Sequence, residues 1–209
     1  MDMRHGVLAA ASLAVVLVGC GGAGAVKKAD MTKAVSAAAA AVPAPAEPAP
    51  ARDPKNAMVA VVTTEKGTIR FVLMDQKAPI TVANFVKLAD SGFYNGLVYH
   101  RVVPGFVAQG GDPKGDGSGG PGWTIKGEFT DLPHLKGAVA MARTNDPDSA
   151  GSQYYFCLEA VPSLNGKYAV FGYVIEGMDV VSSLQIGDRM REVKIEEMSR
   201  DKIPAWVPK

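Results

Sequence analysis

Residues 99–112, YHRVVPGFVAQGGD, hold the side chains of this chain that are best suited to chemistry. Arg101 lies in an apolar run, and a buried guanidinium needs a partner because it keeps its proton. Arg101 alone favours an internal ion pair slightly over a place at a cleft mouth. Its neighbours favour the cleft, because a Pro-Gly turn predicts that Phe106 and Gln109 lie beside it. A cation, an aromatic wall and an amide together suit a peptide carbonyl next to an apolar ring.

Other kinds of catalytic site find little support. No serine or cysteine has a recognisable base and orienting residue, which argues against nucleophilic hydrolysis. The glycine-rich stretch 115–122 lacks the Lys-Ser/Thr of a phosphate-binding loop, and we expect a flexible surface loop there. Asp112 and Asp116 do not belong to a complete calcium-loop pattern, and His100 and His134 lack a plausible third ligand. We therefore expect no metal and no cofactor.

The composition is that of a globular chain with charges of both signs. Lys and Arg number 22 and Asp and Glu number 21, which gives a formal net charge of +1. The charges are interspersed without a basic block, so we expect no nucleic-acid partner. The length of 209 residues allows one domain with a sizeable core and some appendages.

The first residues are predicted to be a lipoprotein signal peptide. After Arg4, the apolar stretch 6–18 is too short to span a bilayer comfortably and suits a signal sequence. It ends in Leu-Val-Gly-Cys, which resembles the bacterial lipobox, and we expect residues 1–19 to be removed and Cys20 to be acylated. The alternative is an ordinary signal peptide with Cys20 merely nearby. Cys157 is the only other cysteine, and we expect it to be an inert buried thiol.

Lipidation of Cys20 would place the protein outside the cytoplasm, attached to the periplasmic side of a membrane or to the cell surface. Residues 20–57 are rich in Ala and Pro and offer too little apolar surface to offset chain entropy. We expect this segment to be a disordered linker between the lipid and the folded domain.

The folded domain is predicted to span residues 58–200, followed by a C-terminal tail over 201–209. Alternating apolar residues and turn signals predict strands over 58–62, 69–74, 97–103, 106–109, 139–142, 154–158, 169–174 and 193–198. Helical spacing predicts one helix that begins near Pro79 and ends at Gly92, and a second over 178–184. The result is a mostly β, antiparallel protein with two helices. Closure of its sheet into a barrel would remove the exposed edges.

Three ordered motifs resemble those of cyclophilins, the peptidyl-prolyl cis–trans isomerases. The first is the run 99–112. The second is Met-Ala-Arg followed by GSQYYF, over 141–156, and the third is LNGKY followed by VFG and EGM, over 164–178. The resemblance extends over about 58–198. It implies a closed eight-stranded antiparallel barrel capped by two α-helices, and a protein that accelerates X-Pro isomerisation.

The resemblance also implies the catalytic residues and the proline pocket. Arg101 matches the arginine that stabilises the twisted amide, and we assign Phe106 and Gln109 to the same catalytic set. The proline pocket is matched by Phe106, Tyr155 and Leu164, which without the resemblance would be ordinary core residues. Tyr155 replaces the usual Phe, so we expect a hydroxyl at the pocket wall.

The remaining matched positions bind the rest of a peptide. Gln109 and Gln153 match the two glutamines that bind peptide backbone or shape the groove. Ala142 and Arg143 match a pair whose main chain binds substrate like an added strand. Tyr168 occupies the polar position beside the pocket, where His is common.

We therefore expect an isomerase that acts as a monomer on proline-containing unfolded or exported polypeptides. The alternative is a membrane-tethered module that binds prolyl peptides, or acts as a chaperone, with incidental turnover. Rate enhancement on a prolyl peptide would distinguish the enzyme from the binding module.

Overall fold

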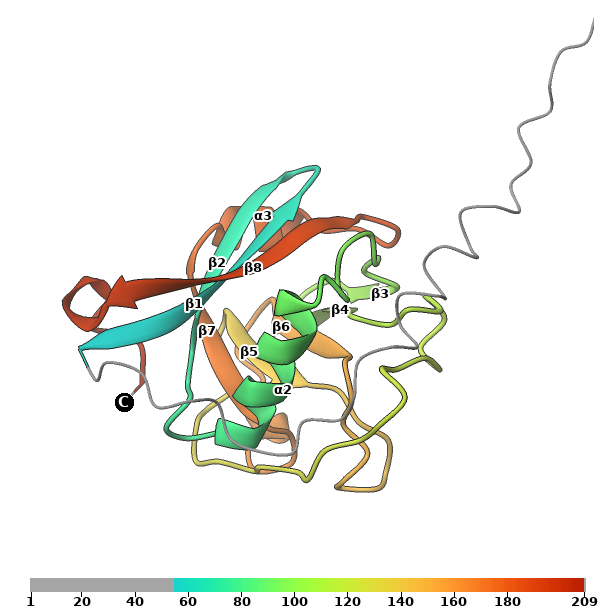
Figure 1. Cartoon of the computed structure of the whole chain (residues 1–209), viewed down its shortest axis with the longest axis horizontal. Helices are drawn as coiled ribbons and strands as arrows, with labels where there is room; N and C mark the ends of the chain where they lie inside the picture. The colour runs from blue at the N-terminus through green and yellow to red at the C-terminus, as the bar shows by residue number, and fades with distance from the viewer. Residues whose placement is uncertain (1–54, 209) are drawn as a thin grey trace, which may run out of the picture.

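The computed structural model describes residues 55–208 (Figure 1). The predicted signal peptide, the lipidation site Cys20 and the linker up to residue 54 lie outside the described residues. The strands are β1 (Asn56–Thr64), β2 (Gly67–Leu73), β3 (Arg101–Val103), β4 (Val107–Gly110), β5 (Ala138–Met141), β6 (Tyr154–Cys157), β7 (Val170–Glu176) and β8 (Met190–Ser199). The helices are α2 (Pro79–Asp90) and α3 (Met178–Ser183), with short 3-10 turns η1 (Pro162–Leu164) and η2 (Arg200–Lys202).

The strands form one antiparallel sheet in the order β3-β4-β6-β5-β7-β2-β1-β8. The helix α2 packs against β8, and α3 packs against β2. This confirms the predicted mostly β architecture with eight antiparallel strands and two helices. The segments that precede the two outermost strands lie together, because Val98 and Arg189 form an antiparallel bridge. Closure of the sheet into a barrel stays a prediction.

Local sequence signals explain where these elements begin and end. The β1–β2 hairpin turns at Gly67, whose φ of 140° is open to glycine but unfavourable for other residues. Pro79 occupies the first turn of α2, where its missing N–H costs nothing. The free N–H groups of Ile80 and Thr81 donate to the Glu128 carboxylate, at 3.0 and 2.7 Å. A loop residue distant in sequence therefore supplies the cap of α2.

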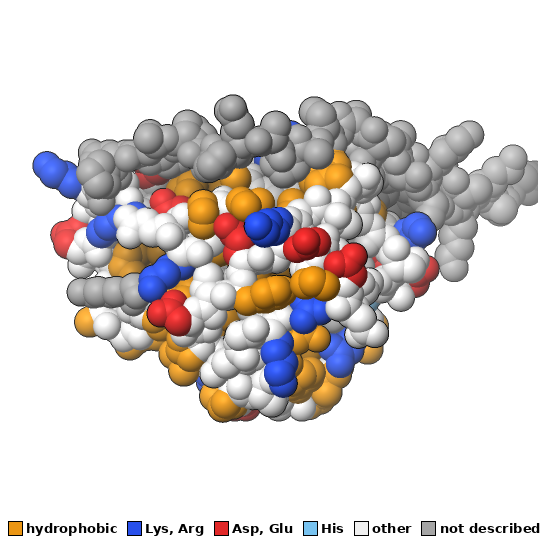
Figure 2. Space-filling view, turned by 90° about the horizontal axis from the view of Figure 1, so that it is seen from below, with side chains coloured by type: hydrophobic (Ala, Val, Ile, Leu, Met, Phe, Trp, Pro, Cys, Tyr) orange, Lys and Arg blue, Asp and Glu red, His pale blue; other side chains and the backbone are white. Residues whose placement is uncertain are grey.

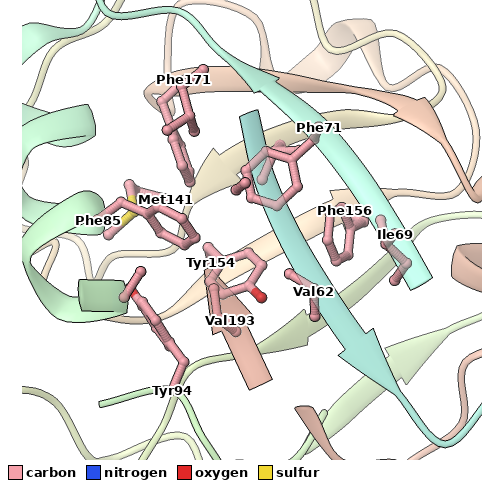
Figure 3. Close-up of a cluster of buried hydrophobic side chains, with 14 of the residues drawn as sticks. Val62, Ile69, Phe71, Phe85, Tyr94, Met141, Tyr154, Phe156, Phe171 and Val193 are labelled. Carbon is pink, nitrogen blue, oxygen red and sulfur yellow. The ribbon is translucent and has the colours of Figure 1, made fainter. Parts of the chain in front are cut away.

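The main core lies between the sheet and α2 and is built from aromatic side chains (Figure 3). Phe71 is central, with the rings of Phe85 and Phe156 edge-on to it at 5.6 and 5.7 Å. Along β6, Tyr154 and Phe156 belong to this core. Tyr155 and Cys157 belong to a second cluster on the opposite face of the sheet. Because side chains alternate along a strand, β6 is buried on both faces and supplies one residue in two to the second cluster.

The second cluster also includes part of the C-terminal tail. Val207 is buried in it, and the Trp206 ring lies edge-on to Tyr173 with 6.5 Å between ring centres. The predicted boundaries at 58 and 200 are narrower than the structured segment, because β1 begins at Asn56 and η2 continues the chain beyond β8.

Figure 2 shows a face on which acidic and basic side chains are interspersed with small hydrophobic areas. Between residues 55 and 208, no helix has the length and apolar composition that crossing a membrane requires.

Candidate active site

A pocket of about 180 Å³ opens at the edge of the sheet beside the β3–β4 hairpin. It brings together eight of the nine predicted site residues from three distant parts of the chain. Its lining is Arg101, Phe106, Val107, Gln109, Ala142, Arg143, Tyr155, Leu164 and Tyr168. The ninth predicted residue, Gln153, contacts Gln109 and lines a neighbouring groove. The roles of these residues stay a prediction, whereas their proximity is a property of the fold.

The β3–β4 hairpin places Arg101 over the pocket. Arg101 and Gln109 are directly opposite in the hairpin register, and Gly105 has the positive φ of 70° that the turn requires. The Arg101 guanidinium donates from Nη1 to Gln109 Oε1 at 3.4 Å. Its central carbon lies 5.8 Å from the centre of the Phe106 ring, within the range of a cation–π interaction.

The structure corrects one expectation about Arg101, because this side chain is exposed rather than buried in its apolar run. Its neighbour Val102 points the other way and packs against the main core. Among the described residues, no carboxylate lies within ion-pair distance of Arg101. The alternative of an internal ion pair is therefore wrong.

Two glutamines connect this arginine to the glycine-rich loop. Gln109 donates from Nε2 to Gln153 Oε1 at 2.9 Å. Gln153 in turn donates to the carbonyls of Gly117 and Gly119, both at 2.9 Å. The hydrogen bonds run in one direction from Arg101 to the loop, so each amide has its orientation set by its neighbours.

The glycine-rich loop 115–122 is irregular, and its hydrogen bonds attach it to the rest of the fold. Its flexibility stays a prediction. The buried carboxylate of Asp112 accepts three backbone N–H groups from residues 114–117. Together with Gln153, Asp112 holds the loop as one wall of a groove of about 600 Å³ beside the pocket. Lys114 and Arg143 are the charged residues that line this groove. The high glycine content of residues 115–122 indicates an irregular backbone, but it does not indicate that this loop forms the wall of a groove.

The Tyr155 side chain forms the back of the pocket. Its ring is 4% exposed and meets Tyr168 edge-on, with 6.0 Å between ring centres. The hydroxyl does not point to the pocket wall as expected, because it lies 3.1 Å from Nε2 of the buried His134. Burial raises the pKa of Tyr155 well above its usual value, so the hydroxyl stays neutral. The sequence predicts no metal site at His134 and carries no signal that pairs this residue with Tyr155.

Arg143 is held by carbonyl groups at the junction of pocket and groove. Its Nε and Nη2 donate to the Lys167 carbonyl at 3.0 and 2.7 Å, and its Nη1 donates to the Thr144 carbonyl at 2.7 Å. The guanidinium carbon lies 4.8 Å from the centre of the Tyr168 ring. The Arg143 side chain therefore fixes the segment that carries Tyr168, a role beyond the main-chain one that we expected.

The main chain of residues 142–143 beside the pocket has one of its hydrogen-bonding groups already paired within the protein. The Ala142 N–H donates to the Gln153 carbonyl at 2.9 Å. A peptide that adds along this edge would therefore bind the Ala142 carbonyl or the main chain of Arg143.

Within residues 55–208, no group of three or more His, Cys, Asp or Glu side chains could hold a metal ion. Cys157 is buried in the second cluster, and burial raises the pKa of its thiol to about 12. The arrangement instead offers a pocket with the apolar side chains of Phe106, Tyr155 and Leu164 and with two guanidinium groups, of which that of Arg101 is exposed.

Comparison with known proteins agrees with this geometry. Residues 58–202 match the family model described as cyclophilin type peptidyl-prolyl cis-trans isomerase/CLD. A peptidyl-prolyl cis-trans isomerase of Synechococcus elongatus is 51% identical over 138 residues, which cover 65% of this chain and 94% of that protein. Peptidyl-prolyl cis-trans isomerase B of Bacillus subtilis is 50% identical over 130 residues, covering 61% and 90%.

A solved structure agrees as well. The crystal structure of a cyclophilin type isomerase from Cryptosporidium parvum has a TM-score of 0.63 and 27% sequence identity, and covers 67% of this chain and 98% of its own. The family model, the relatives and this structure lead to the same assignment. The chain belongs to the cyclophilin-type peptidyl-prolyl cis–trans isomerases.

Proposed function

We propose that this isomerase acts on X-Pro bonds of exported polypeptides and that Arg101 stabilises the twisted amide during rotation. The observation that carries the mechanism is an exposed guanidinium with no carboxylate partner among residues 55–208, at the mouth of an apolar pocket. A cation in that position can form its strongest interaction with a substrate, because the fold does not use it for an internal ion pair.

The reaction explains why such a simple site suffices. Rotation about a peptide bond has a barrier of about 18–20 kcal/mol because it breaks amide resonance. No bond is cleaved and no proton has to move, so the protein needs only to bind the twisted state better than the planar one. In the twisted state the prolyl nitrogen becomes pyramidal and gains a lone pair. A donor from Arg101 to that lone pair acts only in the twisted state.

The pocket would hold the proline ring while the preceding carbonyl rotates. Its apolar walls are Phe106, Tyr155 and Leu164, and its volume of about 180 Å³ suits a single small ring. One of the similar solved structures, 28% identical with a TM-score of 0.62, is a cyclophilin from Cryptosporidium parvum in the presence of the dipeptide Ala-Pro. The presence of that dipeptide in a similar protein supports an X-Pro ligand for this site.

The substrates and the location belong to the same proposal. The signal sequence and the Cys residue at its end support lipid attachment at Cys20 on the outer side of the cytoplasmic membrane. The Ala- and Pro-rich segment up to residue 57 would then hold the domain away from the lipid, where it meets exported chains as a monomer. For the domain itself we propose a closed barrel, supported by the hydrogen bonds of Tyr99 N–H to the Asp188 carbonyl and of Met190 N–H to the Leu97 carbonyl, both 2.9 Å.

Replacement of Arg101 tests the mechanism. We expect Arg101→Ala to lower kcat/KM for a prolyl tetrapeptide by about 100-fold or more, because it removes a donor used only in the transition state. The melting temperature should stay the same, since Arg101 is exposed. Wild-type turnover in Arg101→Ala would contradict the mechanism. Peptide binding without rate enhancement in the wild-type protein would favour the alternative of a tethered prolyl-peptide-binding module.

A further inference from the structure

His134 lies behind the pocket and contacts two of the segments that form it. It is 1% exposed and does not line the pocket itself. Its ring Nε2 lies 3.1 Å from the Tyr155 hydroxyl, and its ring Nδ1 lies 3.1 Å from Asn165 Oδ1. Its main-chain N–H donates to the same Oδ1 at 2.8 Å, and its carbonyl accepts the Val161 N–H at 2.8 Å. One buried residue therefore reaches Tyr155 and both ends of the segment 161–165.

The hydrogen bonds determine which ring nitrogen of His134 carries the proton. Asn165 Oδ1 accepts the main-chain N–H of His134, which identifies that atom as the amide oxygen. An oxygen without a proton can only accept, so His134 Nδ1 must be the protonated nitrogen. The lone pair of Nε2 is then free to accept the hydroxyl proton of Tyr155. Burial lowers the pKa of His134, which favours this neutral form.

This arrangement determines what Tyr155 presents to a ligand. The two rings are nearly parallel, at 16° with 6.2 Å between centres, and the hydroxyl proton is directed into the interior. The pocket therefore meets only the apolar ring of Tyr155. Without His134, the hydroxyl would either lack a partner in an apolar cluster or turn toward the pocket, and both are unfavourable for binding proline.

The same residue supports the wall that carries Leu164. The turn η1 is a single 3-10 turn, and its own hydrogen bonds are Leu164 N–H to the Val161 carbonyl and Asn165 N–H to the Pro162 carbonyl, both 3.1 Å. So short an element has little stability of its own. His134 holds the residue before it and the residue after it, which fixes Leu164 between them.

We propose that His134 is a positioning residue of the proline pocket. It keeps the Tyr155 hydroxyl out of the pocket and fixes the turn that carries Leu164, so that the Tyr155 and Leu164 walls present only apolar groups to proline. The inference rests on the proposed function in taking this pocket as the proline site. His134 touches no reacting atom, and its effect is on peptide affinity rather than on the rotation step.

The test compares peptide affinity in the full-length protein with and without the Tyr155 hydroxyl. We expect His134→Leu to raise the Kd for a prolyl tetrapeptide, and its KM, about tenfold while kcat changes less than about twofold. In a Tyr155→Phe background, where no hydroxyl needs a partner, the same change should raise Kd less than about threefold. If His134 had a merely structural role, His134→Leu would raise Kd by the same factor in the wild-type and the Tyr155→Phe backgrounds.

Asn165→Ala provides a second variant, because this residue is exposed and its replacement leaves the core intact. We expect Asn165→Ala to raise Kd about threefold, whereas the matched control Gln185→Ala, an exposed side chain near α3, should match the wild type. Wild-type Kd in Asn165→Ala, or an equal rise for His134→Leu in both backgrounds, would overturn the inference. Kd is an equilibrium quantity that does not depend on the rate of rotation, so failure of the Arg101 mechanism would be seen separately in kcat.

Discussion

Gln109 lies opposite Arg101 in the β3–β4 hairpin and accepts its Nη1–H group at 3.4 Å, while its own Nε2 donates to Gln153 at 2.9 Å. The oxygen and nitrogen of an amide lie in one plane, so the bond to Gln153 directs Oε1 toward the arginine. Gln109 therefore sets the direction of the guanidinium at the pocket mouth.

Removal of this amide should affect rotation more than binding. We expect Gln109→Ala to lower kcat for a prolyl tetrapeptide about tenfold with a smaller change in KM, because a misdirected guanidinium fails chiefly in the transition state. The measurement is isomerisation followed at several substrate concentrations, with Gln185→Ala as the exposed control. A rise in KM at unchanged kcat would instead assign Gln109 to substrate binding alone.

Arg143 should matter for stability as well as for the shape of the site. Its guanidinium donates to the carbonyls of Thr144 and Lys167 and lies over the Tyr168 ring. We expect Arg143→Ala to lower the free energy of unfolding by about 1–2 kcal/mol in urea titrations, toward the low end for charge-assisted hydrogen bonds because this side chain is only partly buried. Arg143→Lys should recover only part of this loss, because one ammonium cannot reach all these carbonyls. An unchanged free energy of unfolding in both variants would show that hydrogen bonds to water replace those of the Arg143 guanidinium with no loss of stability.

Acidification should destabilise the fold well before its carboxylates titrate. Burial is the main cause that lowers the pKa of both His134 and His100. The unfolded chain keeps a histidine pKa near 6.5, so below about that pH it binds protons that the folded state does not. Stability is therefore full above the unfolded pKa and decreases as the pH falls below it.

Urea unfolding at pH 7.5 and pH 5.5, at constant ionic strength, measures this effect. The free energy of unfolding should be lower at pH 5.5, and the difference should shrink in His134→Leu, which removes one of the two contributing groups. Equal wild-type stability at the two pH values would contradict the expectation.

Lipid attachment predicts a simple change in location. We expect the wild-type protein in the membrane fraction and Cys20→Ala in the soluble extracytoplasmic fraction, because the acyl chains supply the membrane affinity. Fractionation with immunoblotting measures the distribution, and the isomerase activity of the released domain serves as the control for folding. Retention of Cys20→Ala in the membrane would argue against the lipid and for another mode of attachment.

The elements of the fold could be predicted from sequence because their signals are local. The short apolar run 154–158 and helical spacing after Pro79 each report on neighbours a few residues away, and both elements begin within a residue of the expected position. The exposure of Arg101 was also accessible, since alternation in a three-residue strand directs it opposite to Val102. The apolar residues around Arg101 suggested burial of the whole run, although Arg101 and Val102 lie on opposite faces of β3.

Features that depend on distant partners could not be predicted in the same way. The Tyr155 hydroxyl has its partner His134 in the loop that precedes β5. Glu128 caps a helix that begins 49 residues earlier in the chain, at Pro79. Nothing in the spacing of these residues brings them together. The glycine-rich loop gave a true signal for irregular backbone, but its attachment depends on Asp112 and Gln153.

The position of β1 has a mechanical consequence. The chain enters the described fold at the first residues of β1, and this strand lies between β2 and β8, hydrogen-bonded along both edges. A force applied along the chain before Asn56 would load these two ladders in shear, so many hydrogen bonds would have to break together rather than one after another. If the domain is tethered through its N-terminus as proposed, a pull on that end would therefore meet high mechanical resistance before the fold unravels.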